Sequence, residues 1–299
     1  MCVGLNRGFC ATVLVALLGW GELHAEETLS IGVEQFSDKL DLLDDLHPAA
    51  VLLRAGLGEG LVSLRRRSDG APTKGQFELA IADSVNINAD FSRWSFRIRR
   101  GARFQSGRAI SSEDVVFSLE RCRAAGALGG VKKSVSRRSK TPYDAMDEWV
   151  DLEVDPELRG TLARDLARCP IWERESASIF GVEFGQGANV VGGGPFRISS
   201  YRPGKQYGLS RLGRSEQAGD GGPAAIVVRG FSEPGRGLTA LREGTIALLF
   251  TTDAAVLGKA SKDETLVLQD CGGLRAIKRR ELLLSCEPSL DLARMRMGR

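Results

Sequence analysis

The sequence predicts an α/β fold built around a mixed sheet, because strand-like and helix-like patterns alternate along the chain. In "RWSFRIRR", Trp94, Phe96 and Ile98 fall on one face, the period-two pattern of a half-buried strand. Val115 and Leu119 then recur at helical spacing. The 299 residues are 42% hydrophobic and 26% charged. This composition predicts a globular protein with a core large enough to fold without stabilising cross-links.

The first 25 residues are typical of a secretory signal peptide. Arg7 precedes an apolar stretch over residues 9–20. The preference of signal peptidase sites for small residues places the cut after Ala25. The apolar stretch is shorter than the about 20 residues that a bilayer-spanning helix needs, although an uncleaved anchor is the alternative interpretation. We therefore expect a mature chain of residues 26–299 in the periplasm or outside the cell.

Each element of the first half has a local signal. Residues 28–33 alternate as a short strand, and residues 49–64 predict a helix that ends at glycines and exits into a strand. The stretches 77–87 and 93–100 predict neighbouring strands. Ser111 then predicts a helix N-cap, with Asp114 three positions on as the reciprocal acid.

The second half continues the alternation. Residues 126–140, "GALGGVKKSVSRRSK", predict a solvated basic loop, with an anion- or membrane-contacting patch as the alternative. Leucines at spacing four predict a helix over residues 156–170, and the Pro-Gly turn inside residues 194–212 predicts a hairpin. Further strands are expected at 224–231, after a short helix in 235–250, and in the closing segments 265–271 and 274–286.

Charge and histidine content argue against several functions. The net charge of +3 from 41 basic and 38 acidic residues is too balanced for a nucleic-acid partner. His24 leaves with the signal, so His47 alone remains for a Ser–His system or a catalytic zinc site, each of which needs more partners. The glycines of residues 181–196 do not form the G-x-G-x-x-G pattern. The sequence therefore predicts no enzyme, no metal site and no cofactor.

Four cysteines follow the expected cut, namely Cys122, Cys169, Cys271 and Cys286. An oxidising compartment would allow one or two disulfides among them, in three possible full pairings. Buried free thiols are the alternative. Cys271 and Cys286 flank a predicted strand pair and are the first pairing to test.

Four blocks of the sequence resemble the extracellular solute-binding proteins, family 5, which feed ABC importers with oligopeptides, dipeptides or nickel. They are "WSFRIRRGARFQSGRAISSEDVVFS" (94–118), "VGGGPFRISSYRPGK" (191–205), "ALREGTIALLF" (240–250) and "LGEGLVSL" (57–64). Gly193 stands where the family usually has threonine, and Ala247 where it usually has aspartate. The resemblance implies a periplasmic-binding-protein-like (type II) lobe with a mixed sheet over residues 26–299.

Family members usually run to about twice this mature length and close two lobes over a ligand. The resemblance therefore implies the first lobe without the second. It implies a binding protein for peptides or related small solutes that works with the membrane subunits of an ABC importer. The alternative is a single-lobe interaction or regulatory module, or a truncated and decayed binding protein. An uncovered lobe would also self-associate or need a companion chain.

The resemblance also implies where a solute would bind. In the family, the loop after the first strand lines the cleft, and here that loop contains Glu34, Gln35 and Phe36. In the family, the segment after the helix that begins near Ser111 also approaches the ligand. Here Tyr143 is the nearest aromatic residue of that segment. A surface-loop aromatic is the alternative interpretation of Tyr143.

Overall fold

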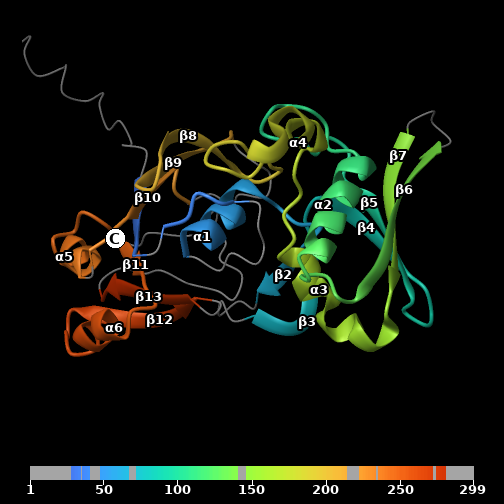
Figure 1. Ribbon diagram of the computed structural model, residues 1–299. Helices are drawn as coiled ribbons and strands as arrows, with labels where there is room; N and C mark the ends of the chain where they lie inside the picture. Colours follow the sequence, from blue (N-terminus) through green and yellow to red (C-terminus); the bar gives the residue numbers. More distant parts are fainter. Residues whose placement is uncertain are drawn as a thin grey trace, which may run out of the picture.

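Two sheets and the helices packed on them form the fold (Figure 1). The computed structural model describes residues 28–34, 36–40, 48–66, 72–140, 146–213, 222–233, 235–271 and 274–280. The expected signal peptide, His47 and Cys286 lie outside these residues. The mixed sheet and the alternating elements confirm the predicted α/β class.

The larger sheet has seven strands in the order β12-β13-β11-β1-β10-β9-β8. Its strands are β1 (Thr28–Val33), β8 (Phe196–Arg202), β9 (Gln206–Arg211), β10 (Ala225–Gly230), β11 (Leu248–Phe250), β12 (Leu266–Cys271) and β13 (Leu274–Arg279). β1 runs parallel to both β10 and β11, and the outer pairs are antiparallel. The predicted first strand, the hairpin and the strand at 224–231 are therefore confirmed.

Helices pack on both faces of this sheet. Helix α1 (Pro48–Leu57) buries Leu52, Leu53 and Leu57 in one core with the apolar residues of β1 and β10. On the other side, α5 (Arg236–Arg242) and α6 (Ala254–Ala260) enclose a second core with β11, β12 and β13. Figure 1 shows α1 on one side of β10 and β11, and α5 on the other.

The smaller sheet has the order β4-β5-β7-β6, beside a hairpin of β2 (Val62–Arg66) and β3 (Pro72–Leu79). Its strands are β4 (Ala82–Ile87), β5 (Arg93–Ile98), β6 (Val131–Lys140) and β7 (Met146–Val154). Trp94, Phe96 and Ile98 point into a core closed by α2 (Ser112–Ala124) and α3 (Arg159–Ala167), as the alternation predicted. The leucines that predicted a helix over residues 156–170 are only partly buried. Leu162 and Leu166 are in the core, whereas Leu158, in the 3-10 turn η1 (Pro156–Leu158), is 42% exposed.

The capping box predicted at Ser111 is present. The Ser111 hydroxyl accepts from the backbone N of Asp114 at 3.3 Å, and the Asp114 carboxylate accepts from the backbone N of Ser111 at 3.0 Å. Two orphan donors of the first turn are thereby satisfied. This fixes where α2 begins.

The loop predicted over residues 126–140 is wrong for its last ten residues, which form the edge strand β6. Two of its basic residues pair with acids of the neighbouring strand β7: Nε of Arg137 lies 2.8 Å from Asp151, and Nε of Arg138 lies 2.8 Å from Glu148. Lysine and arginine on an edge strand also block pairing with other chains. Two of the charges that suggested a solvated loop or an anion-binding patch are therefore paired within the sheet.

Among the described residues, no helix is both long and apolar enough to cross a membrane. The same residues contain no group of three or more His, Cys, Asp or Glu side chains placed to hold a metal ion.

Candidate ligand-binding edge

The parallel strands β10, β1 and β11 end together at one edge of the larger sheet. In register, Val33 of β1 lies beside Gly230 of β10 and Phe250 of β11. In open α/β sheets, ligands bind outside the carboxyl ends of such strands. The loops that follow these three residues, which we call the carboxyl edge, are therefore the candidate site.

Glu34 links two of these loops to the start of α5. Its carboxylate accepts a short hydrogen bond from the hydroxyl of Thr251, which is 1% exposed, and a long one of 3.4 Å from the backbone N of Gly235. The Thr251 hydroxyl also accepts from the backbone N of Asp253 at 3.0 Å. Asp253 in turn caps α6 by accepting from the backbone N of Ala255 at 2.7 Å. Glu34 thus braces the carboxyl edge.

Phe36 lies directly over the end of β10. A Cβ on Gly230 would come within 2.8 Å of the Phe36 ring, so glycine is required for this close approach. The ring stacks on Tyr207 with centroids 5.6 Å apart, and Tyr207 stacks on Tyr201 at 4.7 Å. The stacked rings of Tyr207 and Tyr201 hold Phe36 in place, and Phe36 remains partly exposed at the edge.

Asp38 lies beside the two tyrosines. Its Oδ2 accepts from the backbone N of Gly204 at 3.0 Å, while its Oδ1 is buried and has no hydrogen-bond partner. Burial, followed by the nearby Asp38 carboxylate, raises the pKa of Tyr207 and of Tyr201. Both phenols therefore remain protonated at neutral pH, and the Tyr207 hydroxyl donates to the carbonyl of Gly187 at 3.2 Å.

The structure thus places two of the four expected ligand-binding residues, Glu34 and Phe36, at the carboxyl edge. Gln35 and Tyr143 lie outside the described residues. Tyr201 and Tyr207 were not expected at this edge from the sequence. Their signal was the pair of aromatic residues that faces across the Pro-Gly turn of the predicted hairpin.

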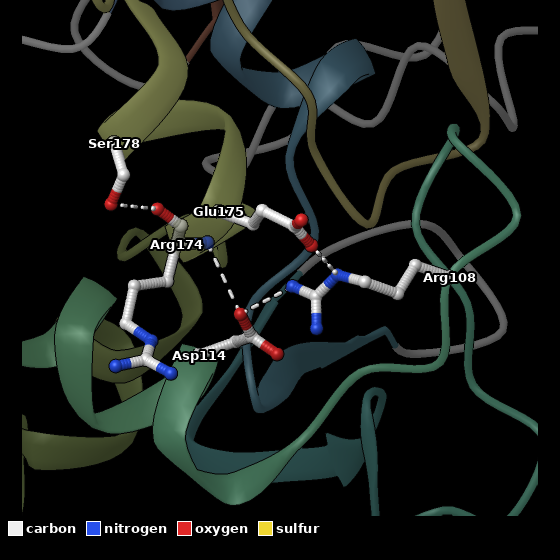
Figure 2. Close-up of a pocket in the computed structure, with 5 residues that line it drawn as sticks. All are labelled: Arg108, Asp114, Arg174, Glu175 and Ser178. Atoms are coloured by element: carbon white, nitrogen blue, oxygen red, sulfur yellow. Dashed lines mark hydrogen bonds and ion pairs between the residues drawn. The ribbon is translucent and has the colours of Figure 1, made fainter. Parts of the chain in front are cut away.

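A hollow of about 300 Å³ lies away from the carboxyl edge, between the starts of α2 and α4 (Arg174–Phe180). Figure 2 shows Arg108, Asp114, Arg174, Glu175 and Ser178 lining it. Arg108 lies 2.5 Å from Asp114 and 3.0 Å from Glu173, and Arg174 lies 2.8 Å from Glu113. The main charged groups are therefore already paired with each other, which is typical of a structural ion network.

The pKa values of the two buried acids fit this role. Burial alone would raise the pKa of Asp114, but hydrogen bonds from Arg108 and Ser111 outweigh it and lower the pKa. Burial alone would also raise the pKa of Glu173. Hydrogen bonds from Ser106, Ser176 and Arg108 outweigh this effect and lower the pKa. Both acids are held ionised at neutral pH.

The block of residues 94–118, which we call the signature region, also joins the two cores. The side-chain amide of Gln105 donates to the carbonyls of Leu57, at 2.7 Å, and Phe196, at 2.5 Å. A Cβ on Gly194 would lie 2.6 Å from the carbonyl of Gly56, and one on Gly192 would lie 2.0 Å from that of Leu57. The Gln105 turn and the triple glycine therefore pack against the end of α1, and both serve as scaffold.

Cys122 of α2 and Cys169, just after α3, form a disulfide with Cα atoms 6.0 Å apart. This resolves one pairing that the sequence left open, and it shows that these two thiols are not free. Only Cys271 and Cys286 remain from the set of four, and Cys286 lies outside the described residues.

An open mixed sheet with an accessible carboxyl edge is the architecture of the type II periplasmic binding proteins. The chain belongs to the bacterial extracellular solute-binding proteins, family 5, whose model matches residues 76–267, more than half of its length. No curated protein sequence matches the chain.

Solved structures share the fold. Listeria monocytogenes OppA bound to peptide has a TM-score of 0.64 and 16% identity, with 83% of this chain and 51% of that chain covered. MoaA from A. tumefaciens R10 in complex with mannopinic acid gives 0.63 and 21%, with 82% and 49% covered. DppA from Helicobacter pylori in complex with peptide STSA gives 0.58 and 18%, with 83% and 52% covered. The chain thus spans about half the length of these proteins.

Proposed function

We propose that the chain is a solute-binding component of an ABC importer, and that it binds peptides or related small solutes at the carboxyl edge. Membership of family 5 supports a solute-binding role. The observation that supports this site most strongly is the position of Phe36. Its aromatic ring is held over Gly230 by two tyrosines and is still partly exposed. Aromatic rings in fixed positions are common contacts in ligand pockets.

The related structures support the ligand class: OppA and DppA are bound to peptides, and MoaA is in complex with mannopinic acid. The related proteins bind solutes, so we propose binding and not catalysis for this chain. The membrane subunits of an importer are its proposed partners. Gln35, which lies between Glu34 and Phe36 in the sequence, is a proposed further contact, as is Tyr143.

Export by residues 1–25 remains part of the proposal. The Cys122–Cys169 disulfide supports it, because such bonds form and persist in oxidising compartments. Mass spectrometry of the native protein should therefore find a chain that begins near residue 26 in the exported fraction. An intact Met1 in the cytosolic fraction would contradict export.

The binding test is thermal unfolding of residues 26–299 with a pool of short peptides at up to about 10 mM, because a ligand that binds only the folded state raises the melting temperature. We expect a saturable rise in the chain and in Ile179→Ala, a matched control whose side chain is 74% exposed on α4. Phe36→Ala should abolish the rise. Absence of a saturable rise in the unmodified chain would favour the single-lobe interaction module.

A further inference from the structure

The face of β8, β9 and β10 that turns away from α1 is rich in arginine. Alternate residues of these strands, such as Tyr207, Leu209 and Val228, lie in the core beneath α1. Their neighbours in sequence therefore point to the opposite side of the sheet. We call this side the outer face, and it contains Arg197, Arg202, Gln206, Ser210, Val227 and Arg229.

Cross-strand register confirms that these side chains are neighbours. Arg202 pairs with Gln206, and Gln206 pairs with Arg229. Two arginines thus flank one glutamine, with backbones about 10 Å apart across the middle strand. Further along, Nε of Arg197 donates to the hydroxyl of Ser210 at 3.3 Å. In the centre of the face, Gly208 lies beside Val227 on one side and beside Ser200 on the other, and the Ser200 hydroxyl lies over Gly208.

The helices on this side of the sheet pack elsewhere. In the described part of the chain, α5 contacts β1, β11 and β13, and α6 contacts β12. Figure 1 shows both helices beside that half of the sheet, away from β8 and β9. Arg197 and Arg202 are exposed, and Arg229 is half-buried. An antiparallel sheet can leave one face to water, so exposure alone does not indicate a partner.

Charge is what distinguishes the outer face. The strands "FRISSYR", "QYGLSR" and "AIVVRG" contain no aspartate or glutamate. Nε of Arg229 is buried and has no acceptor, and a buried donor without a partner costs free energy. The exposed arginines of the smaller sheet are different, because Arg97, Arg137 and Arg138 each lie within 3 Å of a carboxylate.

We propose that the outer face is a docking surface for an acidic helix of a partner protein. Carboxylates of the helix pair with Arg202 and Arg229, and its small side chains lie on the flat strip of Ser200, Gly208 and Val227. An anionic lipid surface fits less well, because membrane binding also needs apolar anchors. The exposed large apolar side chains of the described residues all lie outside these three strands.

The test uses residues 26–299 and a fluorescein-labelled amphipathic peptide of Leu, Ala and Glu, followed by fluorescence anisotropy. The same peptide with Gln for Glu removes the charge. The test variant is Arg202→Gln with Arg229→Gln. Its matched control is Lys132→Gln with Lys133→Gln, which removes the same charge from two exposed positions of β6. Arg229→Lys keeps the charge, and thermal unfolding checks that each variant is folded.

We expect the Glu peptide to bind in a salt-dependent manner and the Gln peptide to bind at least about tenfold more weakly. The arginine variant should lose at least about tenfold in affinity, and the lysine control less than about twofold. Equal losses in both variants, or no binding of the Glu peptide, would overturn the proposal. So would tighter binding to phosphatidylserine vesicles than to the peptide, or self-association that the arginine variant abolishes.

Discussion

The guanidinium of Arg108 lies 2.5 Å from Oδ1 of Asp114, the carboxylate that also closes the capping box of α2. The same arginine lies 3.0 Å from Glu173 at the start of α4. One side chain therefore ties a turn to the first residues of two helices (Figure 2). Because the neighbouring Gln105 joins this turn to the larger sheet, the signature region holds the two cores together.

Arg108→Gln should lower the free energy of unfolding at neutral pH by about 2 kcal/mol, because a buried carboxylate loses a charged partner. The folded-state pKa values of Asp114 and Glu173 are lowered. Their stabilising contribution is therefore present above the unfolded pKa of about 4 and is lost as the pH falls through the folded-state value. Urea unfolding should show the difference between chain and variant shrinking below about pH 4.

Arg123→Gln is the control for this prediction. Arg123 lies 2.5 Å from Glu120 one helical turn away, but both side chains are more than a third exposed. Its loss should cost less than about 0.5 kcal/mol. A difference between the chain and Arg108→Gln that is constant from pH 7 to about pH 3 would contradict the assigned role.

The Cys122–Cys169 disulfide should contribute about 4 kcal/mol to stability, because it closes a loop with a sequence separation of 47 and restricts the unfolded chain. The double variant Cys122→Ala, Cys169→Ala should lose this amount in urea unfolding, and a reductant should have no comparable effect on the variant. Thiol labelling that finds both cysteines free in the exported protein would show that the bridge does not form.

Thr251→Val should destabilise the chain by about 1 kcal/mol by removing the hydroxyl that donates to Glu34, and Thr251→Ser should restore it. Because the two residues share this bond, Glu34→Ala and Thr251→Val should show a coupling energy of at least about 0.5 kcal/mol in a double-mutant cycle. Strictly additive effects on unfolding would mean that Glu34 does not brace the edge.

Gln105→Ala should cost about 2 kcal/mol, because two carbonyls at the junction lose their donor. Gln105→Glu should cost more, since a carboxylate would face the carbonyls of Leu57 and Phe196 without a proton to donate. The urea concentration at the unfolding midpoint should be highest for the unmodified chain, lower for Gln105→Ala and lowest for Gln105→Glu. A Glu variant as stable as the chain itself would remove Gln105 from the junction.

Elements with a local signal could be predicted from the sequence. The alternation in β5, the Ser111 cap of α2 and the Pro-Gly turn between β8 and β9 each depend on residues a few positions apart. β6 could not be predicted, because its basic residues suggest a strand only when the acids of β7 are known to lie beside them. The glycines that precede the segment then made it resemble a loop.

The candidate site shows the same division. Family resemblance placed Glu34 and Phe36 near a ligand, and the structure brings both to the carboxyl edge. Their actual contacts depend on residues far away in the chain: Thr251 for Glu34, and Gly230 and Tyr207 for Phe36. The Cys122–Cys169 pairing is likewise fixed by the packing of α2 against the end of α3. No spacing rule contains this information.

The most direct test of the proposed solute site is a chemical-shift map of residues 26–299, titrated with a pool of short peptides. One lobe covers only one side of a ligand, so we expect weak binding, with Kd near about 1 mM. We predict saturable shifts concentrated at the amides of Phe36, Gly230 and Thr251, and their loss in Phe36→Ala. Saturable shifts confined to residues away from the carboxyl edge, or no shifts at all, would contradict the proposed site.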